Sequence, residues 1–398
     1  MLNIEEKKSY RISLHHLGFR PFFLLAGLSA VVFMLVWGWL YHINMDLFRN
    51  SGLSALDWHA HEMIFAYALA VVAGFLLTAV RNWTNVQTLH GLPLLILALL
   101  WLLARLTPFL HHPDALLLMA IVDLGFDILL CLAVLQPILK VKQWAQLGIL
   151  LPLVLITLSN SLFYLGLLGY SLSGTQTGLY AGLYLLILLI LLMSRRVLPF
   201  FIEKGVEQEV TLTNYTWLDI ASIVLLLSFI GLQLFTPFKT LAAVNAATLF
   251  LLHSLRLFGW YTPGIWQKPL LWILFIAYGW IVSGFGLTAL AHVMPLSPML
   301  AIHAFAYGGI GLMTIGMMAR VALGHTGRNV FDPPAMLKPL FLLIILGSLI
   351  RVAFPIFSPG LYSLWIGLSQ LAWILAFGLF SWIYVPMLIK PRVDGRYG

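Results

Sequence analysis

The chain has 398 residues, of which 61% are hydrophobic and only 9% are charged. Soluble globular proteins carry about 25% charged residues, so this composition excludes an ordinary soluble protein and predicts an integral membrane protein. The single cysteine, Cys131, excludes a disulfide within the chain and a Cys-based metal motif.

Twelve apolar stretches are long enough to cross a lipid bilayer. A hydrocarbon core about 30 Å thick requires roughly 20 apolar residues in a helix. We therefore predict an all-α, polytopic membrane helix bundle that forms a single integral membrane domain over residues 1–398, with no separate soluble domain. The predicted spans cover residues 19–42, 58–80, 90–108, 114–139, 145–169, 176–200, 216–235, 240–258, 269–291, 297–322, 335–356 and 362–388.

The basic residues predict how these helices are oriented. Cytoplasmic segments of membrane proteins are enriched in lysine and arginine. With twelve spans, 18 of the 22 lysines and arginines fall on the side that holds both termini. Both termini are therefore predicted to be cytoplasmic, and the net charge of +8 requires no nucleic acid partner.

The second predicted helix opens with ionisable side chains, in the stretch DWHAHEMIFAY at residues 57–67. His59 and His61 lie about 200° apart around an α-helix and cannot easily face one site together, whereas His59 and Glu62 share a face. One face would then hold a metal or haem, and the other a second metal or a proton path. The alternative is a capped helix start with Asp57 as the N-cap.

The fourth predicted helix carries two acidic residues near the middle of the membrane. Asp123 and Asp127 are four residues apart, so they lie on one face of the helix. Carboxylates are costly in the hydrocarbon region unless they have partners, and they are often functional there. The pair is either a proton relay or is hydrogen-bonded to a partner such as Asn160 on the fifth helix.

The eighth and tenth helices also place histidines within apolar runs. His253 lies beside Arg256, which could bind a haem propionate through charge-assisted hydrogen bonds. His303 and Tyr307 share a face of the tenth helix, and the glycines that follow either allow close helix packing or leave room for a macrocycle. The tripeptide Phe-Ala-Tyr occurs at residues 65–67 and 305–307, which we interpret as coincidence.

The sequence resembles the NnrS family of bacterial inner-membrane proteins over essentially its whole length. The resemblance is carried by FRPFFLLAGL at residues 19–28, WHAHEMIFAYALAVVAGFLLTAVRNWT at 58–84, RVLPFF at 196–201 and IGMMARVALGHTGR at 315–328. One departure is Phe275, which stands where relatives often have a histidine. A family site on the ninth helix is therefore not assumed.

The resemblance implies a protein of the bacterial inner membrane that contains haem, of the b type, and copper. It would bind or convert nitric oxide or related nitrogen oxides and protect against nitrosative stress, in connection with denitrification. Quinol is a candidate electron donor, and an oxidoreductase activity is left open. The family positions to examine are His59, His61, His303, Arg320 and His325.

The leading hypothesis assigns these side chains to cofactors. We expect His61 and His303 to be axial haem ligands. The candidate metal ligands are His59, His61, Glu62 and His303. The candidate cofactor-binding group on the inner side comprises His253, Arg256, Arg320 and His325.

Two other functions are compatible with the sequence. A secondary transporter of haem, metal or a small molecule would use Asp123 and Asp127 as its proton site. A respiratory haem-copper reductase is less well supported, because residues 176–235, which include the sixth and seventh helices, contain no histidine.

Overall fold

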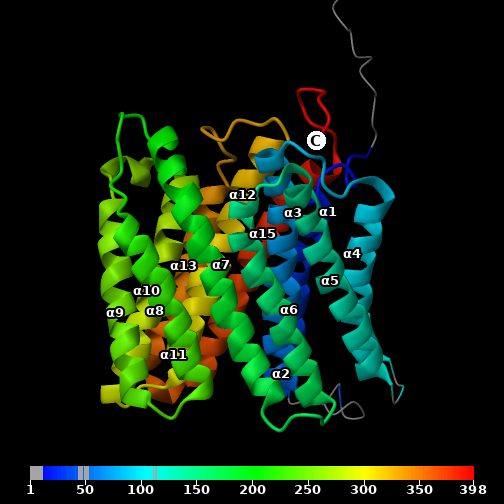
Figure 1. The fold of residues 1–398 in the computed structure, drawn as a ribbon. Coiled ribbons are helices and arrows are strands. Elements are labelled where there is room, and N and C mark those ends of the chain that lie inside the picture. The colour runs from blue at the N-terminus through cyan, green and yellow to red at the C-terminus, as the bar shows by residue number, and fades with distance from the viewer. Residues whose placement is uncertain (1–11, 44–47, 49–52, 111, 113) are drawn as a thin grey trace, which may run out of the picture.

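The computed structural model describes residues 12–43, 48, 53–110, 112 and 114–398, which form a bundle of helices (Figure 1). Within these residues there is no β-strand. The elements are α1 (Phe19–Ile43), α2 (Ala55–His61), η1 (Glu62–Ala68), α3 (Leu69–Thr84), α4 (Gly91–Leu106), η2 (Thr107–Phe109), α5 (Ala115–Val141), η3 (Trp144–Gln146), α6 (Leu147–Leu167), α7 (Gly174–Gly205), α8 (Thr216–Phe235), α9 (Lys239–Gly259), η4 (Pro263–Gln267), α10 (Pro269–Val293), α11 (Pro298–His303), η5 (Ala304–Gly311), α12 (Leu312–His325), α13 (Leu337–Val352), α14 (Phe354–Phe357), η6 (Pro359–Leu361) and α15 (Tyr362–Ile389).

The prediction of twelve spans is confirmed for the described residues, which include twelve helices long and apolar enough to cross a membrane. The predicted ends lie within a few residues of the observed ends, and the seventh span, Thr216–Phe235, matches at both. The start of α1 and the end of α15 lie on the same side of the bundle, where the Ser13 amide donates to the Ile389 carbonyl at 2.9 Å. The cytoplasmic location of that side stays a prediction.

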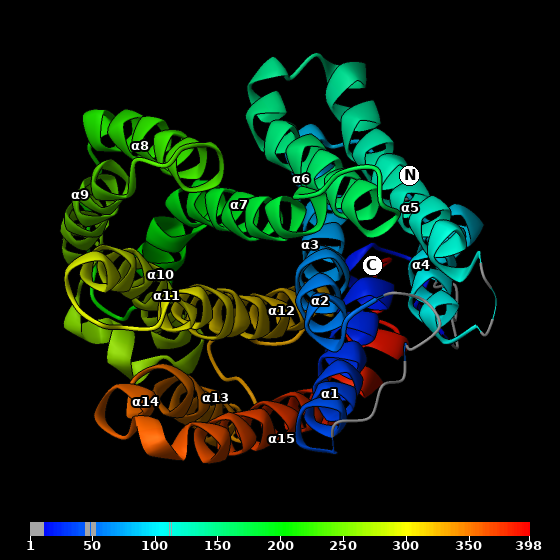
Figure 2. The same cartoon turned by 90° about the horizontal axis from the view of Figure 1, so that it is seen from below.

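Two spans occupy the centre of the bundle, seen from below in Figure 2. The continuous helix α2–η1–α3 and the continuous helix α11–η5–α12 are the most deeply buried of the twelve spans. They meet where the hydroxyl groups of Tyr67 and Thr314 hydrogen-bond at 2.5 Å. The pair α8 and α9 lies at one edge of the bundle, while α4 and α5 lie at the opposite edge.

Each central span contains a π-helical segment, η1 or η5, shortly after its histidines. Both copies of the Phe-Ala-Tyr tripeptide lie in these segments, so the repeated tripeptide coincides with a repeated local structure. The interpretation of the repeat as coincidence did not predict this. A π-helical turn displaces carbonyl groups from the regular α-helical pattern. One displaced carbonyl is used, because the indole Nε1 of Trp101 donates to the Ala66 oxygen at 3.1 Å.

The fully buried Arg20, near the start of α1, hydrogen-bonds to the end of α15. Its Nη1 donates to the carbonyl oxygens of Leu388 and Lys390 at 2.6 and 2.8 Å. Nearby, the rings of His16 and Tyr397 stack with centroids 4.4 Å apart. Burial, with the charges of His15 and Arg20, lowers the pKa of His16 to about 4, so its ring is neutral at pH 7.

Replacing Gly182 by alanine should destabilise the bundle. A Cβ atom there would lie 2.5 Å from Cζ of the fully buried Phe65 in η1. Overpacking of this kind typically reduces the free energy of unfolding by about 1–3 kcal/mol. Gly231→Ala on α8 is the matched control, because its new Cβ would have no atom within 4 Å. Thermal unfolding in detergent compares the variants, and equal midpoints would contradict the prediction.

Candidate functional site

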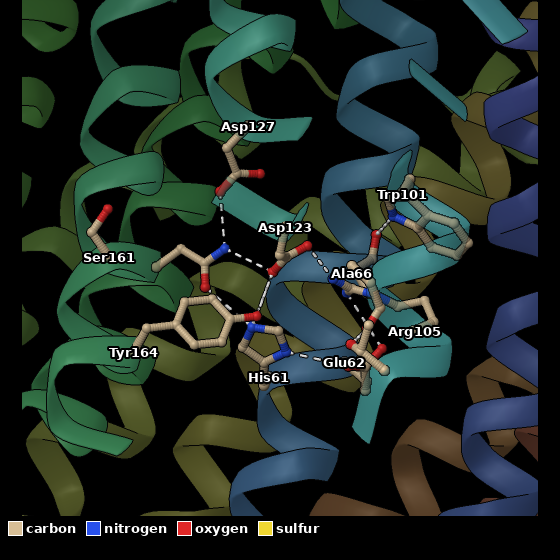
Figure 3. A network of polar contacts seen from close by, with 12 residues as sticks. His61, Glu62, Ala66, Trp101, Arg105, Asp123, Asp127, Ser161 and Tyr164 are labelled. Carbon is tan, nitrogen blue, oxygen red and sulfur yellow. Dashed lines mark hydrogen bonds and ion pairs between the residues drawn. The ribbon is translucent and has the colours of Figure 1, made fainter. Parts of the chain in front are cut away.

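Seven polar side chains gather among α2, η1, α4, α5 and α6 in the interior of the bundle (Figure 3). All seven are buried, and we call them the His61 cluster. Its members are His61, Glu62, Arg105, Asp123, Asp127, Asn160 and Tyr164. Polar groups in the hydrocarbon region require partners, and these residues supply partners to one another.

Both ring nitrogens of His61 face acceptors. Nδ1 lies 3.3 Å from a carboxylate oxygen of Glu62. Nε2 lies 3.1 Å from the amide oxygen of Asn160 and 3.3 Å from a carboxylate oxygen of Asp123. A ring nitrogen that donates a proton has no lone pair to offer a metal, so this arrangement suits a hydrogen-bonded His61 better than an iron-bound one.

Asp123 is the centre of the cluster. One carboxylate oxygen accepts from Nη2 of Arg105, and the other accepts from Nδ2 of Asn160 at 3.0 Å and from the Tyr164 hydroxyl at 2.9 Å. The Asn160 amide also donates to Asp127 at 2.9 Å. Asn160 therefore bonds both aspartates, which is one of the two alternatives given for this pair, and the proton relay stays a prediction.

The charges of the cluster do not balance without added protons. It holds three carboxyl groups, Glu62, Asp123 and Asp127, but only one arginine, Arg105. A His61 ring that is protonated on both nitrogens adds one positive charge. One further proton, on a carboxyl group, would then make the cluster neutral. Oδ1 of Asp127 is buried without a hydrogen-bond partner, so chemically the cluster can take up and release a proton there.

The predicted shared face of His59 and Glu62 is not what the structure forms. Glu62 contacts His61 and also accepts from Nη1 of Arg105 at 3.4 Å. The ring of His59 instead stacks on Trp37 of α1, with centroids 4.4 Å apart and planes within 7°. The physical reason is that a buried carboxylate requires a cation, which Arg105 supplies to Glu62.

A second group lies around His59 and His303, and we call it the His59–His303 group. Arg351 of α13 lies close enough for its charge to act on both rings, and His59 also acts electrostatically on His303. Nδ1 of His303 donates to the Met299 carbonyl at 2.8 Å, so its Nε2 carries a lone pair. Arg351 donates to that Nε2 at 3.2 Å. Nδ1 of His59 is buried without a hydrogen-bond partner.

His61 and His303 thus belong to different groups of contacts. His61 faces α5 and α6, whereas His303 faces α13. The charge of Arg351 acts on both His303 and His59, whereas His61 contacts Glu62, Asn160 and Asp123. The two histidines of the opening stretch do face different partners, as their angular separation predicts.

The predicted inner residues fall into two places. Arg256 and His253 lie on α9, where Nη2 of Arg256 donates to Asp219 at 2.8 Å and Nδ1 of His253 lies 2.6 Å from the Tyr278 hydroxyl. Arg320 and His325 lie on α12. The Arg320 guanidinium sits over the Phe201 ring at 3.9 Å, and the His325 ring is 5.6 Å from that of Phe19.

A cavity of about 70 Å³ lies between α3, α7 and η5–α12, among mostly apolar side chains. No histidine is among the residues that line it. Binding sites for drug-sized ligands measure about 300–1,000 Å³, so this cavity suits a molecule of few atoms. Among the described residues, no group of three or more His, Cys, Asp or Glu side chains is placed to hold a metal ion.

Sequence reasoning missed several partners that define these groups. Arg105, Tyr164 and Arg351 were not among the predicted site residues, although the two arginines lie inside predicted apolar spans. An arginine within a span is rare and usually functional, so this signal was available. Nothing in the sequence indicated that Arg105 would meet Glu62 and Asp123, or that Arg351 would meet His303.

Replacing Arg105 by methionine should destabilise the protein strongly. It leaves Glu62 and Asp123 without their cation, and breaking a buried ion pair from one side reduces the free energy of unfolding by about 3–5 kcal/mol. Lys268→Met is the matched control, because its partner Glu207 is 72% exposed and such pairs contribute about 0–1 kcal/mol. Denaturant unfolding in micelles measures both.

The double variant Arg105→Met with Asp123→Asn should recover part of the lost stability. Equal effects of the single variants Arg105→Met and Lys268→Met would contradict this account.

Comparisons with known proteins agree with this architecture. The sequence matches the family described as NnrS protein over residues 13–392, which is nearly the whole chain. A comparison with curated proteins found no match. The twelve-span bundle and the near-complete coverage together show that the chain belongs to the NnrS family.

Proposed function

We propose that this protein binds copper between His59 and His303 and uses it to bind or convert nitric oxide or a related nitrogen oxide. The proposal rests on one observation. Nδ1 of His59 is buried without a partner, Nε2 of His303 carries a lone pair, and the charge of Arg351 acts on both rings. Membership of the NnrS family suggests a nitric oxide-related membrane protein and supports this direction. Protection against nitrosative stress at a bacterial inner membrane is part of the proposal.

The residues present fit copper. Imidazole nitrogen is a good ligand for copper, and metal-bound histidines usually donate the other ring N–H to a carbonyl or carboxylate. His303 has that arrangement through Met299. When bound, copper would supply a one-electron centre with affinity for nitric oxide.

Arg351 controls access to this site. Its guanidinium occupies the His303 lone pair, and it also donates to the Tyr362 hydroxyl at 3.3 Å. Metal binding therefore requires Arg351 to leave His303, and Tyr362 offers it an alternative partner. Trp37 stacks on His59 and fixes the plane of that ring.

Haem fits the described geometry less well. Both nitrogens of His61 face acceptors, and the cavity of about 70 Å³ between α3 and α7 has no histidine in its lining. Arg256, expected to bind a propionate, is already paired with Asp219. Haem binding therefore stays a prediction from the family resemblance, as does quinol as the electron donor.

Copper binding should depend on both histidines and should be opposed by Arg351. His59→Gln and His303→Gln should each weaken Cu(I) affinity by at least about tenfold. Arg351→Gln should strengthen it by about tenfold, because a hydrogen bond to a charged group contributes about 1.5–3 kcal/mol. Competition with a chromophoric Cu(I) chelator measures the affinities.

The matched control is His292→Gln. His292 is exposed, and within the described residues its ring hydrogen-bonds to the Thr240 hydroxyl. It should leave the affinity unchanged. If His59→Gln and His303→Gln bind copper as tightly as the wild type, the copper site proposed here is wrong.

A second candidate function is proton-coupled transport, and the His61 cluster favours it. The cluster lacks charge balance without added protons, and the free Oδ1 of Asp127 offers a place for one. Asp127→Asn should therefore abolish uptake of Cu(I) driven by a pH gradient in proteoliposomes. The same variant should leave Cu(I) affinity unchanged, because Asp127 lies outside the His59–His303 group. Wild-type vesicles that show no gradient-driven uptake would remove this candidate.

A further inference from the structure

A small cavity of about 50 Å³ lies between α7, α8 and α9. Its charged lining is contributed by Arg195, Asp219 and Arg256, and most of the rest is leucine and isoleucine. In Figure 2, α8 and α9 stand at the edge of the bundle beside α7 and α10. The cavity is separate from both the His61 cluster and the His59–His303 group.

The three charges in the cavity leave an excess of positive charge. Nε of Arg195 donates to both oxygens of Asp219 at 2.9 Å, and Nη2 of Arg256 donates to Oδ1 at 2.8 Å. One carboxylate therefore faces two guanidinium groups, and one positive charge is left over. The side chain of Arg256 is only 5% exposed, so its charge is poorly screened by water.

His253, which lines the same cavity, has a ring nitrogen without a hydrogen-bond partner. The Tyr278 hydroxyl is fully buried, and Arg256 also lies against it. The Tyr278 hydroxyl lies 2.6 Å from Nδ1 of His253. When the hydroxyl donates to Nδ1, the ring carries its proton on Nε2. That Nε2 is buried without a partner, in a fully buried residue that lines the cavity.

A net positive charge and an unused N–H donor, enclosed by apolar side chains, form a site for an acceptor that carries negative charge. We propose that this cavity binds one anionic oxygen group, supplied by a small free oxyanion or by the phosphate of an anionic lipid. Its volume admits a group of a few atoms, since one water occupies about 30 Å³ of liquid.

The site is accessible from one end of the bundle. Asp219 is in the first turn of α8 and Arg256 is in the last turn of α9, so both lie near the same membrane interface. The Arg195 side chain is 34% exposed and marks the open side of the cavity. Anions in solution and lipid headgroups both reach this depth.

The test uses the purified full-length chain in detergent and chloride-free buffer. Isothermal titration with nitrate measures binding of a free oxyanion, and native mass spectrometry with phosphatidylglycerol or phosphatidylcholine measures lipid selectivity. Wild-type protein should bind nitrate, or retain phosphatidylglycerol in preference to phosphatidylcholine, and the two arms identify the source of the anionic group.

The variants test whether these particular residues bind the anion. Arg195→Gln and His253→Leu should each weaken binding by roughly tenfold or more, because each removes a donor to a charged acceptor. His253→Gln should retain part of the affinity, since its amide places an N–H near the position of Nε2.

Arg196→Gln is the matched control, because this neighbouring arginine contacts Gln146 and Trp83 instead of the cavity. Size-exclusion chromatography checks that each variant is folded. The proposal is overturned if the wild type binds nitrate no more than the Arg195→Gln variant and shows no lipid preference. It is also overturned if Arg196→Gln weakens binding as much as Arg195→Gln does.

Discussion

The ion pair between Arg105 and Asp123 is the interaction on which the polar interior of this bundle depends. Neither charge is tolerable alone at this depth, because an unpaired ion in a medium of low dielectric constant is strongly destabilising. Together with His61, Asn160 and Tyr164, the pair connects four spans. Apolar side chains distinguish poorly between a neighbouring helix and lipid. The polar network therefore fixes which helices adjoin and in what register.

The number and limits of the spans could be predicted from the sequence because they depend on local properties. A helix satisfies its own backbone hydrogen bonds, so length and apolar content are enough to identify a span. The partners of buried side chains depend on how helices pack, which no local pattern contains. Glu62 illustrates the difference, because helical spacing pairs it with His59, whereas the structure pairs it with Arg105 on α4.

The histidines show why burial alone does not identify a metal ligand. His61 is the more deeply buried of the two in the opening stretch, yet its nitrogens are used by acceptors. His303 is less buried, but a backbone carbonyl fixes its tautomer and leaves a lone pair on Nε2. A ring nitrogen that keeps a lone pair or lacks a partner separates imidazoles that can bind a ligand from structural ones. By that criterion His59 and His253 also stand out, since each has a buried nitrogen without a partner.

The position of α2 links the two polar groups at the centre of the protein. His59 and His61 are two residues apart on one short helix, and they point to different partners. Any change in the His61 cluster that moves or rotates α2 must also move His59 relative to His303. A proton gained or lost by the cluster changes the balance of charge that holds His61 in place. The same short helix therefore holds one histidine of each group, so the packing of α2 places both rings.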